Sequence, residues 1–346
     1  MTQPLKTKNR RSQTYLYPLA ATAIIYAGFA LYLYEPYFDS FKTQQYLVVI
    51  NVCLASLGCF VLSRRWVSLF VGSFLAGAIY GFGPFVLGLA RFHPSAGFLA
   101  AGIPWLFCPA AFIGRTRWRW LSVPFTALPF FAIPLFFRIS AHYRLFAAST
   151  QARLRLGDLP GFLAPLVATS RNLTGIGFYH VPLAILVMGF AMLLAARRVG
   201  IIIILCLGTV LACSSSFLDV SPIMWLSIPT VCCSVLIGVG LQGLASAGFT
   251  DRKWVLVTTA MMAALSIIAL LLATKYFQVF AGLGNRYATL FTETAKMYIL
   301  GMVAVAILFF MIRAKSRIAP LRWTILCSTM ALDIFLGASF IIDKNL

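Results

Sequence analysis

Charge is scarce in this sequence, and acidic charge is the scarcest. Only 10% of the 346 residues are charged and 61% are hydrophobic, whereas a soluble domain has about 25% charged residues. A water-soluble fold could not bury that much apolar surface. Apolar runs of about 20 residues recur along the chain, and each is long enough to cross a bilayer. The sequence predicts an all-α polytopic integral membrane protein whose main partner is the lipid bilayer.

Histidine is also rare, and its positions exclude one cofactor class. The predicted topology places all three at the outer side of the membrane: His93, His142 and His180. A stacked pair of b-type haems is excluded, because the inner haem would have no histidine ligand. The histidines could form an outward-facing metal or proton-handling site with Asp219 or Glu293. Their spacing is long and irregular, so surface or interfacial positions are the better prediction.

The positions of the cysteines do not indicate a metal site or a set of disulfides. None of the eight cysteines has the spacing of a metal site or of a disulfide framework. All lie inside or at the edge of predicted spans, where cysteine behaves as a small apolar residue. We therefore expect no metal and no cofactor.

The formal net charge of +20 would suggest a nucleic-acid partner in a soluble protein. Here the basic residues lie in short clusters between apolar runs, as at Arg115, Arg117 and Arg119. Such clusters at span ends are typical of topology signals. We therefore expect no nucleic-acid partner.

Eleven apolar segments are predicted to span the membrane. They lie near residues 15–34, 46–62, 66–90, 96–114, 120–137, 179–196, 199–213, 222–241, 254–274, 297–313 and 323–342. With a cytoplasmic N-terminus every cytoplasmic loop is basic, and most acidic residues lie outside. The positive-inside rule therefore predicts a cytoplasmic N-terminus and an outer C-terminus, in a plasma (cytoplasmic or inner) membrane.

The predicted spans fall into two groups. A basic tail (1–14) precedes helices one to five (15–137), an outer loop (138–178), helices six to ten (179–313) and a final helix with a short outer tail (314–346). The second group begins outside, which is the arrangement of an inverted repeat. Within the outer loop, residues 145–156 suggest an interfacial helix, and 159–167 form an apolar segment too short to span the membrane, which could be re-entrant. The alternative is a folded loop that covers the outer surface, which is the more common case.

Prolines concentrate in the third to fifth predicted spans. Proline removes a backbone donor and tends to kink a helix, and a membrane tolerates broken helices only where protein or a wet cavity satisfies the backbone. These spans are therefore predicted to wall a cavity. The third span also has Ser73, Gly77 and Gly81 at spacing four, which predicts close packing against another helix.

One carboxylate, Asp333, lies near the middle of a predicted span. An ionisable group at that depth costs at least about 2.5 kcal/mol unless it is paired or hydrated. Asp333 is therefore the first candidate for a proton or cation site. The alternative is a hydrogen-bonded acid that holds the last span to its neighbours. Asn51, in the second span, is a candidate partner.

Further binding candidates are predicted at the outer side. Asp219 lies in a polar connection, and residues 286–313 predict one long helix whose outer turns carry Arg286, Glu293 and Lys296. This cluster could receive an anionic headgroup or solute. A solvated salt-bridge surface is the alternative.

Three functions remain open from the sequence. The leading one is a transporter or permease-like protein for a small solute, which could be coupled to ions or protons. The second is a membrane-embedded transferase or hydrolase that acts on a lipid-linked substrate at the outer face, so the sequence does not decide whether the protein is an enzyme. The third is a non-catalytic subunit with other membrane subunits as partners.

Overall fold

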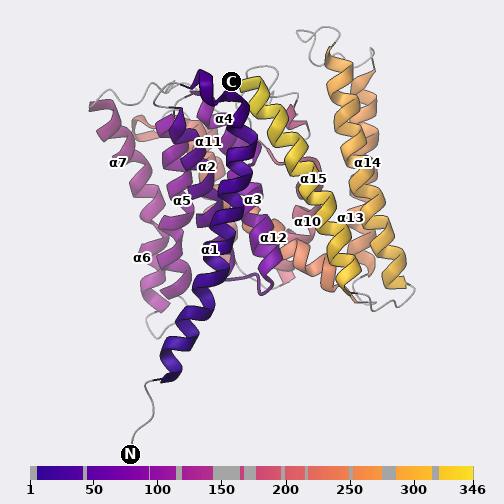
Figure 1. The fold of residues 1–346 in the computed structure, drawn as a ribbon, viewed down its shortest axis with the longest axis horizontal. Coiled ribbons are helices and arrows are strands. Elements are labelled where there is room, and N and C mark those ends of the chain that lie inside the picture. Colours follow the sequence, from indigo (N-terminus) through magenta and orange to yellow (C-terminus); the bar gives the residue numbers. More distant parts are fainter. Residues whose placement is uncertain are drawn as a thin grey trace, which may run out of the picture.

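The computed structural model describes most of the chain and shows a bundle of helices (Figure 1). The described ranges are 6–41, 45–92, 94–113, 119–142, 164–166, 177–195, 199–214, 217–248, 252–274, 286–313 and 319–345. Within them the regular structure is entirely helical, with no strand. The predicted all-α class is therefore confirmed.

The first half of the bundle contains α1 (Lys6–Tyr34), η1 (Glu35–Ser40), α2 (Tyr46–Ser63), α3 (Phe70–Gly81), α4 (Pro84–Phe92), α5 (Pro94–Ile113), η2 (Arg119–Leu121), α6 (Ser122–Thr126) and α7 (Leu128–His142). The second half contains α10 (His180–Ala195), α11 (Val199–Cys213), η4 (Phe217–Asp219), η5 (Pro222–Leu226), α12 (Ser227–Ser246), α13 (Arg252–Ala273), α14 (Arg286–Arg313) and α15 (Ala319–Asn345). The predicted long helix at 286–313 is confirmed as α14.

Apolar helices long enough to cross a membrane make this a multi-pass membrane protein. Within the described ranges there are eight: Tyr17–Ser40, Tyr46–Ser63, Phe70–Leu89, Pro94–Ile113, Pro222–Ser246, Arg252–Ala273, Ala288–Arg313 and Pro320–Asp343. Three shorter apolar helices coincide with the other three predicted spans: Leu128–His142, His180–Leu194 and Gly200–Cys213. Helix α1 begins at the end of the bundle opposite to the end where α15 finishes (Figure 1).

Helices α3 and α12 form the centre of the bundle and pack against each other. They approach closely because glycines face each other: a Cβ on Gly238 would lie 2.9 Å from the backbone oxygen of Gly72. The side chain of Gln242, at the end of α12, accepts hydrogen bonds from the backbone N–H of Ser68 at 2.9 Å and of Leu69 at 3.5 Å. Because α3 begins one residue after Leu69, α12 also satisfies free donors where that helix starts.

The small-residue ridge of the third span packs as predicted. A Cβ on Gly77 would lie 2.5 Å from the backbone oxygen of Ser56, and a Cβ on Gly81 would lie 2.6 Å from the backbone oxygen of Val52. Both oxygens belong to α2, so the ridge lets the α2 and α3 backbones come into contact.

Prolines interrupt some of the predicted spans but not all. The third span is broken at Phe82 and Gly83, and Pro84 begins α4. The fifth span is divided into η2, α6 and α7. In contrast, α5 continues through Pro104 and Pro109, so the prediction of broken helices holds for two of the three spans.

The structure describes only residues 164–166 of the predicted re-entrant segment, and their side chains are buried. Leu166 belongs to the main apolar core, and Ala164 packs with Phe291 of α14. The end of this segment is therefore enclosed by the bundle. The predicted interfacial helix at 145–156 lies outside the described residues.

Candidate functional site

Asp333 lies in the middle of α15 and is only 1% exposed. Its Oδ1 is 2.8 Å from His180 Nδ1, and its Oδ2 accepts a hydrogen bond of 2.7 Å from the backbone N–H of Val181. These partners are the first two residues of α10. The first N–H groups of a helix have no acceptor within the helix, and the helix dipole favours negative charge there. The carboxylate of Asp333, which belongs to α15, therefore caps the N-terminus of α10.

His180 is enclosed by the bundle rather than placed at its surface. It is 1% exposed, so the prediction of a surface or interfacial position for this histidine is wrong. Tyr298 of α14 and Asp333 of α15 lie against this first side chain of α10.

One nitrogen of the buried imidazole has no polar partner. Within the described part of the chain, His180 Nε2 is buried without a hydrogen bond. The ring of Tyr298, on α14, lies edge-to-face against the imidazole at a centroid distance of 5.0 Å. The site is thus formed by α10, α14 and α15. It contains one buried nitrogen, His180 Nε2, that has no hydrogen-bond partner among the described residues.

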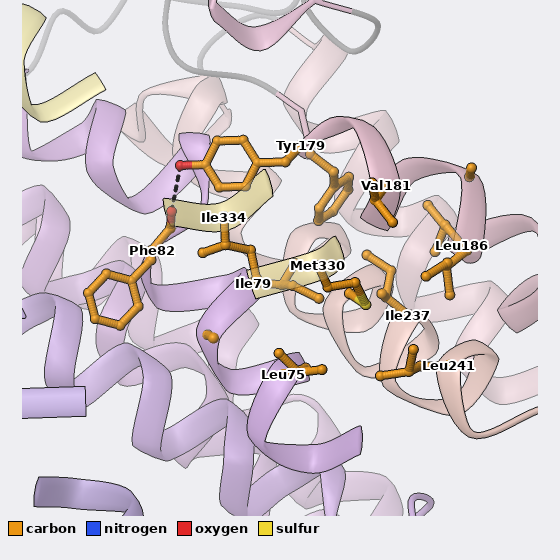
Figure 2. Close-up of a cluster of buried hydrophobic side chains, with 14 of the residues drawn as sticks. Leu75, Ile79, Phe82, Tyr179, Val181, Leu186, Ile237, Leu241, Met330 and Ile334 are labelled. Carbon is orange, nitrogen blue, oxygen red and sulfur yellow. Dashed lines mark hydrogen bonds between the residues drawn. The ribbon is translucent and has the colours of Figure 1, made fainter. Parts of the chain in front are cut away.

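Tyr179 connects this site to the broken third span. Its hydroxyl donates a hydrogen bond of 2.7 Å to the backbone oxygen of Phe82, and Figure 2 shows this bond between Tyr179, the residue before α10, and Phe82. Space for the tyrosine ring exists because residue 337 is glycine; a Cβ there would lie 2.9 Å from Tyr179 Cζ. Two adjacent residues therefore make both contacts. Tyr179 binds the break after α3, and His180 binds the middle of α15.

The pair has two protonation states that differ at Nε2. An ionised Asp333 only accepts, so His180 Nδ1–H donates to it and Nε2 holds a lone pair. A proton added to the imidazole makes it cationic, and a proton added to Asp333 Oδ1 can be donated to Nδ1. In both of those arrangements Nε2 carries hydrogen.

Asn51 is not the partner of Asp333. Its Nδ2 donates a hydrogen bond of 2.8 Å to the backbone oxygen of Pro94, the first residue of α5. Gly97, one turn later, leaves room for the amide, since a Cβ there would lie 2.9 Å from Asn51 Nδ2. Asn51 therefore ties α2 to α5.

The outer candidates lie on the surface and do not converge. Asp219 is exposed in η4, beside Leu218, and both have positive φ. Glu293 forms an ion pair with Lys296 at 2.6 Å, and both side chains are at least half exposed. Glu293 and Lys296 therefore form a solvated surface salt bridge, which was the alternative to an anion-binding cluster. Such pairs contribute little to stability. The side chain of Arg286 lies outside the described residues.

Two of the three histidines, His142 and His180, lie in the described part of the chain. His142 is exposed at the end of α7, His180 is paired with Asp333, and His93 lies outside the described residues. No three His, Cys, Asp or Glu side chains of the described ranges come close enough to hold a metal ion.

A cavity of about 420 Å³ lies elsewhere, near the ends of the helices. Its wall comes from the end of α2, from α5 and α6 in the first half, and from α10, α11 and α12 in the second. The predicted fourth and fifth spans thus line a cavity, and the third contributes only its first residue, Trp66, which precedes α3. Asp333 is not part of the wall of this cavity.

No protein family, curated protein or solved structure matches the chain. Any functional conclusion therefore depends on the residues of this protein alone.

Proposed function

We propose that this chain is a permease-like transporter that moves a small solute across the membrane together with a proton bound by His180 and Asp333. The observation that carries the proposal is the pair itself. Two ionisable side chains, each 1% exposed, lie between apolar helices, and Nε2 of one has no partner among the described residues. Ionisable groups inside membrane spans are costly and typically belong to proton relays and transport pathways.

The helices around the pair support the same function. Transporter sites are typically formed where helices are discontinuous, with a helix N-terminus directed at an anionic group. Here the N-terminus of α10 meets the carboxylate of Asp333, and Tyr179 binds the carbonyl of Phe82 at the break between α3 and α4. A change at the pair can therefore reach the start of α10 and, through Tyr179, the break between α3 and α4.

The protonation state gives the pair its mechanism. Without the extra proton the pair carries one negative charge, which the start of α10 stabilises. The extra proton makes the pair neutral overall and changes the α10–α15 contact in either of two ways. An imidazolium would form an ion pair with the carboxylate, whereas a protonated Asp333 would lose part of its attraction to the start of α10. Proton binding thus biases the position of α15 relative to α10, and solute binding is coupled to it through the same helices.

We also propose that the chain crosses a plasma (inner) membrane eleven times, with its N-terminus in the cytoplasm and its C-terminus outside. The three shorter apolar helices supply the additional crossings. An odd number of crossings agrees with the opposite positions of the start of α1 and the end of α15 (Figure 1). Reporters inserted at 197–198 and at 144–155 are expected to report the cytoplasm and the outside, respectively. The reverse pattern would refute the orientation.

The transport proposal is tested with full-length protein in proteoliposomes that contain a pH-sensitive dye. A panel of small solutes is added outside, and solute-dependent proton movement is recorded. Asp333→Asn and His180→Gln are expected to slow coupled proton movement about tenfold or more, because a hydrogen bond to a charged group is worth about 1.5 to 3 kcal/mol.

Asp219→Asn is the control, since it removes an exposed acid. It should leave coupled movement unchanged at equal protein incorporation. If no solute in a broad panel moves protons, or if the Asp333 variant equals the control, the proposal fails. The transferase or hydrolase and the accessory subunit then remain as hypotheses.

A further inference from the structure

The cavity at the ends of the helices is lined mainly by apolar side chains. Its polar side chains are few, and Thr126 Oγ1 already donates to the backbone oxygen of Val123 at 2.6 Å. The buried polar atoms without partners in the described ranges belong to residues elsewhere, and none lines this cavity. The wall therefore favours an apolar ligand. A ligand rich in hydrogen-bonding groups would lose its hydrogen bonds to water on entering the cavity and would gain few from the wall.

The helix ends around this cavity are basic. The wall residues Leu62 and Trp66 bracket Arg64 and Arg65 in the sequence, and Arg64 donates to the backbone oxygen of Ser68 at 2.9 Å. Further arginines follow α5 and connect α10 to α11 in the sequence: Arg115, Arg117, Arg119, Arg197 and Arg198. No acidic residue lies in these connections. An apolar chamber next to basic connections is complementary to an amphiphile with a negative headgroup.

We propose that this cavity binds an acyl chain of an anionic phospholipid, whose headgroup lies at Arg64 and Arg65, between the wall residues Leu62 and Trp66. The volume of about 420 Å³ is within the range of ligand sites, about 300 to 1,000 Å³. The wall combines helices of both halves, so a bound chain fills the space between them. A membrane lipid is the occupant because the cavity lies among membrane-crossing helices, where acyl chains are the surrounding solvent. This proposal does not depend on proton coupling.

The test uses full-length protein in nanodiscs of phosphatidylcholine that contain a small fraction of phosphatidylglycerol with a photoreactive diazirine in one acyl chain. After irradiation, labelled peptides are identified by mass spectrometry. We expect labelling of the wall peptides around Phe107, Ile204 and Val235, above the labelling of α13 and α14. Phosphatidylcholine with the same diazirine chain is expected to label the wall less.

Two neighbouring residues of α11 provide a matched pair of variants. Ile204 lines the cavity, whereas Ile203 is 60% exposed and is not part of the wall. Ile204→Trp is expected to remove most wall labelling, and Ile203→Trp to leave it unchanged, with α13 and α14 labelled equally in both. If Ile204→Trp does not fold, Val235→Phe fills the same space from α12.

Three results would overturn the proposal. Wall labelling no higher than that of α13 and α14 would show that no chain enters the cavity. Equal labelling in the two tryptophan variants would show that the label reports the outer surface. Equal labelling by phosphatidylglycerol and phosphatidylcholine would show that the site does not select an anionic headgroup, and the proposal as stated would be wrong.

Discussion

Replacing Asp333 by alanine is expected to destabilise the protein by about 3 to 5 kcal/mol, the usual cost of removing one member of a buried charged pair. The substitution leaves His180 Nδ1 and the Val181 N–H without an acceptor, and both are enclosed. Reversible unfolding of purified protein in mixed micelles measures the change. The expected effect is large because one carboxylate satisfies two groups of another helix.

The control is Asp343→Ala on the same helix. Asp343 also accepts hydrogen bonds, from Tyr37 at 2.6 Å and from Ser339 at 3.4 Å, but this site is exposed. Its loss is expected to cost about 1 kcal/mol or less, because water replaces the lost partners.

A double-mutant cycle with His180→Ala distinguishes a pair from two independent groups. The combined loss should be smaller than the sum of the single losses by about 0.5 to 3 kcal/mol, since the two side chains are in contact. Additive losses, or equal losses for Asp333→Ala and Asp343→Ala, would contradict the geometry of the site.

Replacing Gly81 by alanine is expected to destabilise the bundle by about 1 to 3 kcal/mol through overpacking. The added Cβ would meet the backbone of α2, 2.6 Å from the oxygen of Val52 and 2.8 Å from the nitrogen of Ser56. A backbone cannot turn aside as a flexible side chain can, so α2 and α3 must separate. The same unfolding measurement in micelles detects the loss.

Gly102→Ala provides the comparison, because it lies in α5 and a Cβ there would have no neighbour within 4 Å. Alanine is the better helix former by about 1 kcal/mol, so this variant should be neutral or slightly stabilised. A loss at Gly102 equal to that at Gly81 would show that helix propensity, rather than the α2–α3 contact, decides the effect.

Much of the fold could be predicted because apolar runs and prolines act locally. Each predicted span coincides with an apolar helix, and the spacing of Gly77 and Gly81 predicted a close helix contact that the structure contains. Proline was less decisive. Pro84 begins a new helix after a break, while α5 passes through Pro104 and Pro109, because neighbouring helices can satisfy the freed carbonyl groups.

The candidate site could be predicted only as separate residues. Asp333 and His180 are both candidates from the sequence, but the sequence suggests Asn51 as the partner of Asp333 and a surface or interfacial position for His180. The two lie 153 positions apart in the sequence, and no local pattern joins them. One signal was present: a histidine at the start of a short apolar span, in a chain that has a carboxylate in the middle of another.

The sequence by itself determined the class of this protein, because hydrophobicity, charge clusters and small-residue spacing each follow from a few neighbouring residues. Only the tertiary structure decided that His180 is buried, that it meets Asp333, and that the cavity lies away from both. These features depend on where helices distant in the sequence begin and cross, and that is fixed by packing between helices rather than by any one of them.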